Sequence, residues 1–292
     1  MAGNYLLMMF YTTVAGWMIS YFFKMLKGDF VGKNPAQVEN TFGTMLSDPK
    51  AQIFWMLVVI ALGFLVCSLG LQNGVEKITT VMMSCLFIVI LVLIARSVTL
   101  DGASAGLKFY LIPDFTRFTE NGVGNTIFAA MGQAFFTLSL GIGAMAIFGS
   151  YIDKDHSLMG ESVNVIVLDT FVAILAGFII FPACFTYGLE VNAGPSLLFD
   201  TMADVFNHMA GGRIWGTLFF LFMVFAALST VLGVCENILA MIRELTGWSR
   251  KKGCIVCGAG IFVLALTTAL GYSLLHFQPF AAGTAWLDFW DF

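Results

Sequence analysis

Seven long apolar runs place the strongest constraint on what this chain of 292 residues can fold into. A helix crosses the hydrocarbon core of a bilayer in about 20 residues, and runs of that size lie at 5–27, 53–72, 79–99, 127–151, 164–187, 213–242 and 254–275. Only 11% of the residues are charged, too few to cover the surface of a soluble domain, and a content of 59% hydrophobic residues excludes disorder. The sequence therefore predicts an all-α, polytopic transmembrane helix bundle in contact with the lipid bilayer.

The charges say more about partners than about orientation. No block of like charges and no basic stripe is present, which excludes a nucleic-acid partner. If the spans alternate in direction, the loops on one side of the membrane carry eight Lys and Arg residues and those on the other side carry six, which does not decide the orientation. Only the cluster Arg250, Lys251 and Lys252 favours one side, the side with six, as cytoplasmic. The first run lacks the features of a signal peptide. Because this run starts near residue 1 and the last residues, AWLDFWDF, are typical of the approach to another helix, we expect a chain cut from a longer protein.

Nothing in the sequence favours an enzyme. The histidines, His156, His208 and His276, lie near the ends of the apolar runs, and neither H-E-x-x-H nor G-x-S-x-G occurs. Cys254 and Cys257 form a C-x-x-C, but a zinc or redox interpretation needs a second ligand pair or a soluble βαβ context. Because the pair opens an apolar run, we interpret both cysteines as helix-packing residues.

The segment GQAFFTLSLGIGA, residues 132–144, combines polar residues with closely spaced glycines in mid-membrane. Its polar side chains are Gln133, Thr137 and Ser139, and its glycines include Gly141 and Gly143. Each glycine weakens a helix by about 1 kcal/mol relative to alanine, so the pattern predicts a break near residues 138–143. Broken helices at the midplane bind substrate and coupling ions in many transporters, whereas small residues also permit close helix packing. The pattern alone leaves both interpretations open.

Five further polar residues lie in the apolar runs, where unpaired polar groups are costly. Asp169 costs roughly 3 kcal/mol on insertion scales unless a cation, a proton or structural hydrogen bonds relieve it. The adjacent hydroxyls of Ser229 and Thr230 could bind a hard cation or bond back to a carbonyl one turn earlier. The phenol of Tyr11 could meet a substrate carboxylate or a backbone carbonyl, and Glu236 is expected to pair within the bundle.

These residues lie in segments that resemble a known family. The run GQAFFTLSLGIGAM closely resembles the broken sixth span of the sodium:neurotransmitter symporters. In the same order as in that family, FYTTVAGW is similar to the third span, LIPDF to the loop before the break, and AGGRIWGTLFFLFMVFAALST to the loop and start of the eighth span. The resemblance covers nearly the whole chain.

The resemblance implies a partial inverted-repeat fold like that of the bacterial leucine transporter. The family fold has two inverted repeats of five spans followed by two extra spans. Residues 1–292 would form a single transporter domain, incomplete at both ends, in which 1–99 is the end of the first repeat and 127–292 is most of the second. The unwound first span and the outer-gate acid of the tenth span would lie outside this chain.

The resemblance also implies roles for matching residues. The implied sodium ligands are Thr137, Asp169, Ala226 through its carbonyl, Ser229 and Thr230. The implied substrate-binding residues are Leu7, Tyr11, Phe136, Thr137, Ser139, Ile142 and Val234. Among these, Tyr11 would bind the substrate carboxylate, Phe136 would form a lid, and Leu7, Ile142 and Val234 would line the side-chain subsite. Tyr151 and Glu244 are similar to an inner-gate pair.

Asp169 departs from the common family pattern. It matches an asparagine that ligates the first sodium ion in many members, while chloride-independent bacterial members supply a carboxylate, in some cases one turn further on, where this chain has Ala173. We therefore hypothesise that Asp169 is both a sodium ligand and a fixed substitute for chloride. This predicts sodium as the coupling ion, no cofactor and no chloride requirement.

The resemblance implies sodium-coupled symport of a neutral, hydrophobic or aromatic amino acid by alternating access. The partners would be this substrate, sodium ions and the lipid bilayer, and the location would be the bacterial inner membrane. The apolar residues Ile142 and Val234 favour the substrate class, because they offer no charge to meet a charged side chain. The rival interpretation is an inactive truncated fragment with only a structural role.

Overall fold

The described part of the chain is helical throughout its regular elements. The computed structural model describes residues 2–120, 122–141, 143–150, 152, 155–189, 194–275, 278 and 284–291. The chain divides into two compact units, one of residues 1–89 with 192–292 and the other of residues 90–191. This division follows packing, and the repeat boundaries expected from the sequence stay a prediction.

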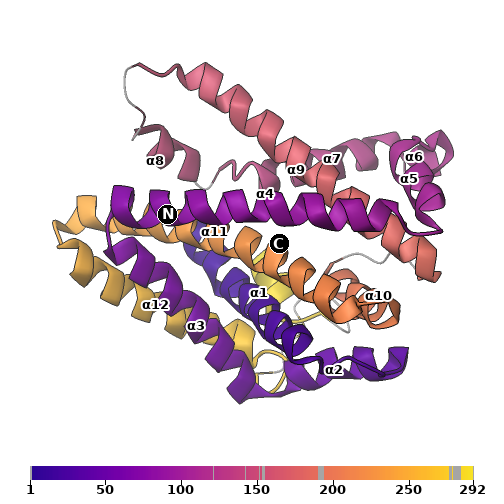
Figure 1. The fold of residues 1–292 in the computed structure, drawn as a ribbon. Helices are drawn as coiled ribbons and strands as arrows, with labels where there is room; N and C mark the ends of the chain where they lie inside the picture. Colours follow the sequence, from indigo (N-terminus) through magenta and orange to yellow (C-terminus); the bar gives the residue numbers. More distant parts are fainter. Residues whose placement is uncertain are drawn as a thin grey trace. The chain divides into compact units, whose positions relative to one another are not determined.

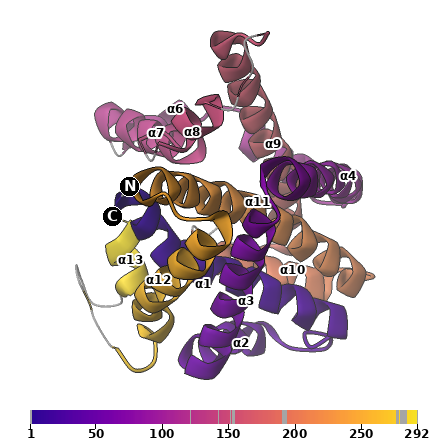
Figure 2. The same ribbon diagram turned by 90° about the vertical axis from the view of Figure 1, so that its left-hand side faces the viewer.

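The first unit is built around four helices that all pack against one another: α1 (Ala2–Lys27), α3 (Pro49–Ser68), α11 (Gly212–Thr246) and α12 (Arg250–Leu270). Figures 1 and 2 show α1, in indigo, enclosed by the other three. Gly16 of α1 permits the close approach of α3, because any larger residue would place its Cβ only 3.0 Å from the backbone of Trp55. The unit also contains α2 (Pro35–Ser47), α10 (Met202–His208), α13 (Trp286–Asp291) and the π-helical segments η1 (Leu71–Glu76) and η2 (Leu197–Thr201).

Aromatic side chains attach the short helices of this unit to its long ones. Tyr21 of α1, which is fully buried, lies with its ring centroid 4.9 Å from that of Phe199 in η2 and 5.2 Å from that of Phe220 in α11. Phe42 of α2 stacks on Phe199 at 5.0 Å. Such aromatic pairs add about 0.5–1.5 kcal/mol each beyond the area they bury, so they hold η2 and α2 against the end of α1.

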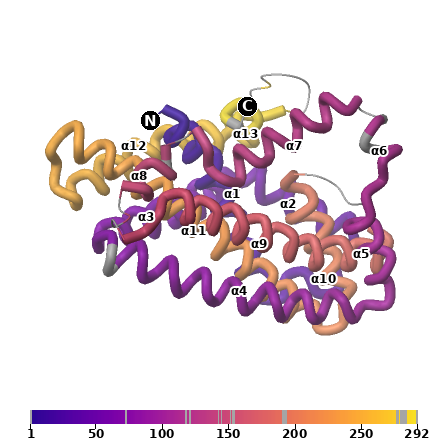
Figure 3. The backbone as a smooth tube through the Cα atoms, turned by 90° about the horizontal axis from the view of Figure 1, so that it is seen from above, coloured from indigo at the N-terminus to yellow at the C-terminus, as the bar shows by residue number. Residues whose placement is uncertain are grey.

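The second unit contains the end of α4 (Lys77–Val98), then α5 (Ala103–Leu111), α6 (Phe115–Glu120), α7 (Val123–Thr137), α8 (Ala144–Ser150) and α9 (Leu158–Tyr187). Helices α5 and α9 pack closely, and Gly106 makes this possible because it has no Cβ. A Cβ at that position would lie 2.5 Å from the carbonyl oxygen of Phe181. The hydroxyl of Ser97, on α4, donates to the carbonyl oxygen of Ile179 at 2.8 Å. Figure 3 draws α7 and α8 as separate helical segments.

Six of the seven predicted spans are single helices long and apolar enough to cross a membrane. Among the described residues these are Ala2–Lys27, Pro49–Ser68, Gly74–Val98, Leu158–Tyr187, Gly212–Thr246 and Arg250–Leu270. The seventh predicted run, 127–151, is divided between α7 and α8, as the predicted break requires. The predicted all-α membrane bundle is therefore confirmed.

Helix boundaries differ from the apolar runs because polar caps extend the helices. Helix α3 begins at Pro49, where Asp48 accepts hydrogen bonds from the backbone N–H groups of Lys50 and Ala51 at 2.9 and 3.3 Å. Helix α2 lies in the polar stretch 28–50, which hydropathy alone indicates to be a loop. Asn34 and Gln37 form a capping box at its start, so local polar contacts rather than apolar runs produce this helix.

Candidate functional site

The break in the second unit lies where the glycine pattern predicts it. Helix α7 ends at Thr137 and α8 begins at Ala144. Between them Ser139 has a φ of 53°, and Gly141 and Gly143 have φ values of 86° and 77°. These left-handed conformations stop a right-handed helix and suit glycine far better than serine. Ser139 is the one non-glycine with positive φ among the described residues, so the backbone is strained at a position implied to meet the substrate.

Thr137 and Asp169 meet in the second unit although they are 32 residues apart. The Thr137 hydroxyl at the end of α7 lies 3.1 Å from both carboxylate oxygens of Asp169 on α9 and donates to them. A hydroxyl and a carboxylate at this separation could ligate one hard cation together, since such cations take oxygen ligands. The same contact also satisfies the alternative interpretation of Asp169 as a hydrogen-bonded structural residue.

Asp169 has no cationic partner among the described residues. The ion pairs of that part of the chain join His156 to Glu161, His208 to Asp204 and Arg250 to Glu236. Asp169 lies within a membrane-span candidate of 30 residues, and its side chain is half-buried. A hydrogen bond from a neutral hydroxyl brings no positive charge to an intramembrane carboxylate, and an uncompensated carboxylate is unfavourable in hydrocarbon unless a mobile cation or proton arrives.

The three implied sodium-binding oxygens of α11 lie together in the first unit. Ser229 Oγ donates to the carbonyl oxygen of Ala226 at 2.8 Å, and Thr230 Oγ1 lies 3.5 Å from the same oxygen. All three residues are half-buried, and their neighbour Val231 is fully buried. The contacts are the back-bonding that hydroxyls make in any helix, and they also bring three neutral oxygens to one point. No charged side chain is part of this group.

A hydrogen bond between side chains fixes the register between α1 and α11. The Asn237 amide donates to Asn4 Oδ1 at 3.1 Å, and both side chains are fully buried. The phenol of Tyr11 lies near the side-chain hydroxyl of Thr230. Leu7 lies between Asn4 and Tyr11 on α1, three residues after the first and four before the second. Val234 lies in the same way between Thr230 and Asn237 on α11, four residues after the first and three before the second. The two apolar residues implied to line the side-chain subsite therefore share one level of the helix pair, next to the implied carboxylate-binding phenol.

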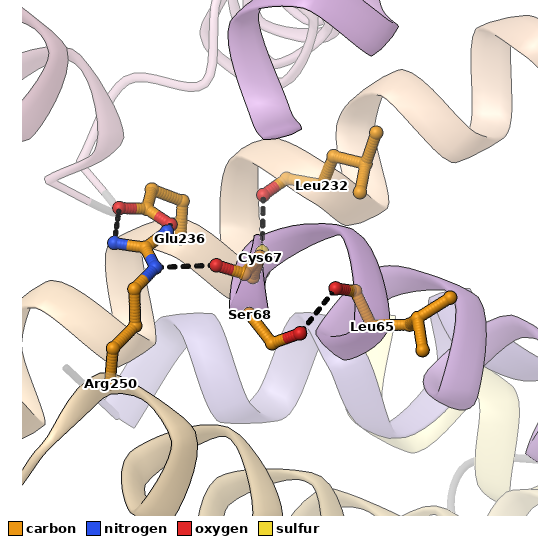
Figure 4. A network of polar contacts seen from close by, with 6 residues as sticks. All are labelled: Leu65, Cys67, Ser68, Leu232, Glu236 and Arg250. Carbon is orange, nitrogen blue, oxygen red and sulfur yellow. Dashed lines mark hydrogen bonds and ion pairs between the residues drawn. The ribbon is translucent and has the colours of Figure 1, made fainter. Parts of the chain in front are cut away.

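Glu236 is the second intramembrane carboxylate, and it carries its own counter-ion. Its side chain is 1% exposed, and Arg250 Nη1 donates to its Oε1 at 3.1 Å while Nη2 contacts Oε2. Arg250 Nε also donates to the carbonyl oxygen of Cys67, so one guanidinium joins α11, α12 and α3 (Figure 4). The expectation that Glu236 pairs within the bundle is confirmed, and bidentate geometry makes the pair strong.

The other predicted site residues are not brought into one group. Phe136 has 54% of its surface exposed, and Glu244 is exposed in the last turn of α11. Ile142 and Tyr151 lie outside the described residues. The ligand roles implied for these residues, and for those above, stay predictions.

Sequence reasoning missed Arg250, Asn4 and Asn237. Arg250 was interpreted as part of an exposed basic cluster, and its pairing with Glu236 could have been found from the need of a buried carboxylate for a cation within reach. The partners Asn4 and Asn237 are 233 residues apart, so only the packing of α1 on α11 joins them. Cys254 and Cys257 are buried in α12 and form no disulfide, and their packing role stays a prediction.

Comparison with known proteins gives one consistent family. The model of the sodium:neurotransmitter symporter family matches residues 29–289. An uncharacterized sodium-dependent transporter of Bacillus subtilis is 34% identical over 100% of this chain and 63% of its own length, and one of Haemophilus influenzae is 32% identical over 99% and 64%. The crystal structure of MhsT in complex with L-phenylalanine is similar with a TM-score of 0.88 and 33% identity, over 99% of this chain and 65% of that one.

The fold and the apolar helices define a multi-pass membrane protein with a fold like that of the bacterial leucine transporter. The chain belongs to the sodium:neurotransmitter symporter family. That family is one of symporters rather than enzymes. The chain spans slightly under two thirds of the length of these relatives, 63% and 64%.

Proposed function

We propose that this chain is part of a sodium-coupled symporter that carries a neutral, hydrophobic amino acid across the bacterial inner membrane by alternating access. The observation that supports this most is the contact of Thr137 with Asp169, which leaves an intramembrane carboxylate without a cationic partner in the described chain. A sodium ion between the two side chains would take both as ligands and neutralise the carboxylate. Asp169 would thereby also replace chloride as the balancing negative charge.

A second sodium ion would bind to the neutral oxygens of α11. Ala226, Ser229 and Thr230 offer a carbonyl and two hydroxyls that already lie around one point. Neutral oxygens supply ion–dipole attraction without a fixed charge, so this site would hold its ion more weakly than the site at Asp169. The two sites would therefore differ in sodium affinity.

The substrate class follows from the level that Leu7 and Val234 share. Val234 is 3% exposed and both side chains are aliphatic, so they favour an apolar substrate side chain over a charged one. Tyr11 lies one turn from Leu7 and would donate its hydroxyl to the substrate carboxylate. The similar protein MhsT was crystallised with L-phenylalanine, which is consistent with this class.

Uptake by the full-length protein in proteoliposomes tests the proposal. An inward sodium gradient should drive accumulation of labelled phenylalanine or leucine, and an equal potassium gradient should not. Because binding energies are reciprocal, sodium should tighten substrate binding by the same factor by which the substrate tightens sodium binding. A screen in which lysine or glutamate outcompetes every apolar amino acid would refute the substrate class.

Two tyrosines of α1 provide a matched test of the carboxylate contact. Tyr11→Phe should weaken substrate binding about tenfold, because it removes one hydrogen bond to a charged group. Tyr21→Phe is the control, since it makes the same change ten residues later at a fully buried ring whose hydroxyl has no hydrogen-bond partner among the described residues. Equal substrate affinities in the two variants would contradict the role of Tyr11.

A further inference from the structure

An apolar groove lies at the ends of two membrane-span candidates of the first unit. It has a volume of about 720 Å³ and lies between the end of α1, the turn 28–33, α10 and the start of α11. Its apolar lining includes Met25, Phe30, Phe206 and Ile214. Pockets that bind small molecules have volumes of roughly 300–1,000 Å³ and are mostly apolar, so this groove has room for an apolar ligand.

Two polar cross-links hold the walls of this α1–α11 groove in place. Arg213 Nε, in the first turn of α11, donates to the carbonyl oxygen of Leu26 at 2.9 Å. Its stem lies against Gly28, whose φ of 86° and missing Cβ leave room for the guanidinium. The side-chain amide of Asn207 on α10 donates to the carbonyl oxygen of Lys33 at the far end of the turn. The groove is therefore a built feature of the fold and not a gap between mobile segments.

The mouth of the groove is positively charged. Arg213 is exposed and hydrogen-bonds only to a backbone carbonyl, so no acidic side chain of the described residues neutralises it. Lys27 is exposed at the end of α1, between the groove-lining residues Leu26 and Gly28. The exposed acid Asp29 follows two residues later and offsets part of this charge. Basic residues at a membrane surface attract anionic lipid.

We propose that the α1–α11 groove binds an anionic phospholipid, with one acyl chain inside and the phosphate against Arg213. Three observations select this occupant. The lining is apolar, the position is at the ends of membrane-spanning helices, and the mouth carries a planar guanidinium suited to phosphate oxygens. A soluble anion would use only the mouth, whereas a lipid uses the mouth and the interior. This site lies beyond the proposed transport function and does not depend on it.

Native mass spectrometry of the purified protein, titrated with phosphatidylglycerol or phosphatidylcholine of identical chains, tests the proposal. Phosphatidylglycerol should bind about tenfold more tightly, and Arg213→Gln should remove most of that preference, because it removes one charge-assisted contact. Val31→Trp, at a groove-lining side chain that is 71% exposed, should reduce the retention of both lipids by obstructing the interior. Lys251→Gln, an exposed cation elsewhere in the same unit, should change nothing.

Other outcomes would overturn the proposal. Equal affinity for the two lipids would remove the role of Arg213, and an unchanged retention in Val31→Trp would place the lipid elsewhere. Displacement of phosphatidylglycerol by millimolar glycerol phosphate would show a soluble-anion site instead. Because Arg213 also caps α1, Lys27→Gln provides a second variant that leaves this cap intact, and it should lower the phosphatidylglycerol preference by a few-fold.

Discussion

Asp169 and Glu236 are carboxylates in the interiors of two membrane-span candidates, and they differ in whether the fold supplies a counter-ion. Glu236 in the first unit is 1% exposed and receives a bidentate guanidinium from Arg250. Asp169 in the second unit is half-buried, and its hydrogen bonds come from the neutral hydroxyl of Thr137. The first carboxylate has its cation built into the fold, and the second has none among the described residues.

This difference separates a structural acid from a candidate ion-binding acid. A buried charge must be paired, and a pair that is complete within the fold has no need of a mobile ion. Glu236 and Arg250 together join α3, α11 and α12, which is a packing role. Asp169 lies beside the helix break at Ser139, where the backbone is irregular and a mobile cation could complete the pair.

The largest expected effect is on the free energy of unfolding, at the ion pair of Glu236 and Arg250. Glu236→Gln leaves the half-buried Arg250 without a counter-charge and should lower the free energy of unfolding by about 3 kcal/mol. The double variant Glu236→Met with Arg250→Met should recover most of this loss, because an apolar pair needs no charge compensation. Thermal unfolding in detergent checks both, with the exposed Glu76→Gln as the control. If Glu236→Gln were as stable as the parent, the ion pair of Glu236 and Arg250 would have no packing role.

The next largest expected effect is on sodium affinity, at Asp169, which has no cationic partner among the described residues. Asp169→Asn in the full-length protein should weaken sodium binding about a hundredfold, because it removes a fixed negative charge from the site. Its unfolding temperature should change little, in contrast to the Glu236 variant. Sodium titration of substrate binding measures the shift, with Asp155→Asn as the control at an exposed acid of the same unit. Unchanged sodium affinity would make Asp169 a structural residue.

A smaller effect is expected at the hydroxyl. Thr137→Val keeps the shape of the side chain and removes the oxygen, so sodium binding should weaken about tenfold. Thr137→Ser keeps the oxygen and should stay within about twofold of the parent, since the hydroxyl can still reach Asp169. The same sodium titration distinguishes these outcomes. Equal losses in the two variants would show that the methyl group and not the oxygen matters.

The smallest effect concerns a third carboxylate, outside the spans. Burial, and after it the negative charge of Glu39, raises the pKa of Asp200 in η2 to about 6. Because this folded-state pKa lies above the ordinary value of 3.8, the folded state holds the proton more tightly, and stability falls as the pH rises from about 4 to 6. Here a proton neutralises the acid, and Tyr21 is another titratable group near it.

Asp200→Asn should therefore remove this pH dependence. At pH 8 the variant should be more stable by about 1 kcal/mol, a modest value because the side chain is half-exposed and solvent screens its charge. At pH 4 the variant and the parent should unfold at the same temperature. If the unfolding temperatures of the variant and the parent differed by the same amount at every pH from 4 to 8, the raised pKa of Asp200 would be contradicted.

The sequence predicts the spans and the break well because both depend on local composition. The apolar runs indicate six single helices, and the spacing of Gly141 and Gly143 locates the end of α7. Local composition is also sufficient to select Asp169 and Thr137 as unusual in hydrocarbon. Their contact across 32 residues needs the end of α7 to lie beside α9, which no local pattern contains.

The sequence is a poor guide where tertiary packing or capping decides. The basic run at 250–252 has the pattern of an exposed cytoplasmic cluster, yet its first residue turns inward to Glu236. Helix α2 forms in a polar stretch because Asn34 and Gln37 cap it. The register of α1 on α11 depends on Asn4 and Asn237, which are 233 residues apart in the chain.

The chloride dependence of transport tests the central claim most directly, namely that Asp169 supplies the fixed charge that balances the coupling ion. Sodium-driven uptake of an apolar amino acid by the full-length protein would be measured with external chloride and with chloride replaced by gluconate. The account predicts equal uptake in both media for the parent, and uptake that requires chloride for Asp169→Asn. Collapse of uptake by the parent without chloride would contradict it.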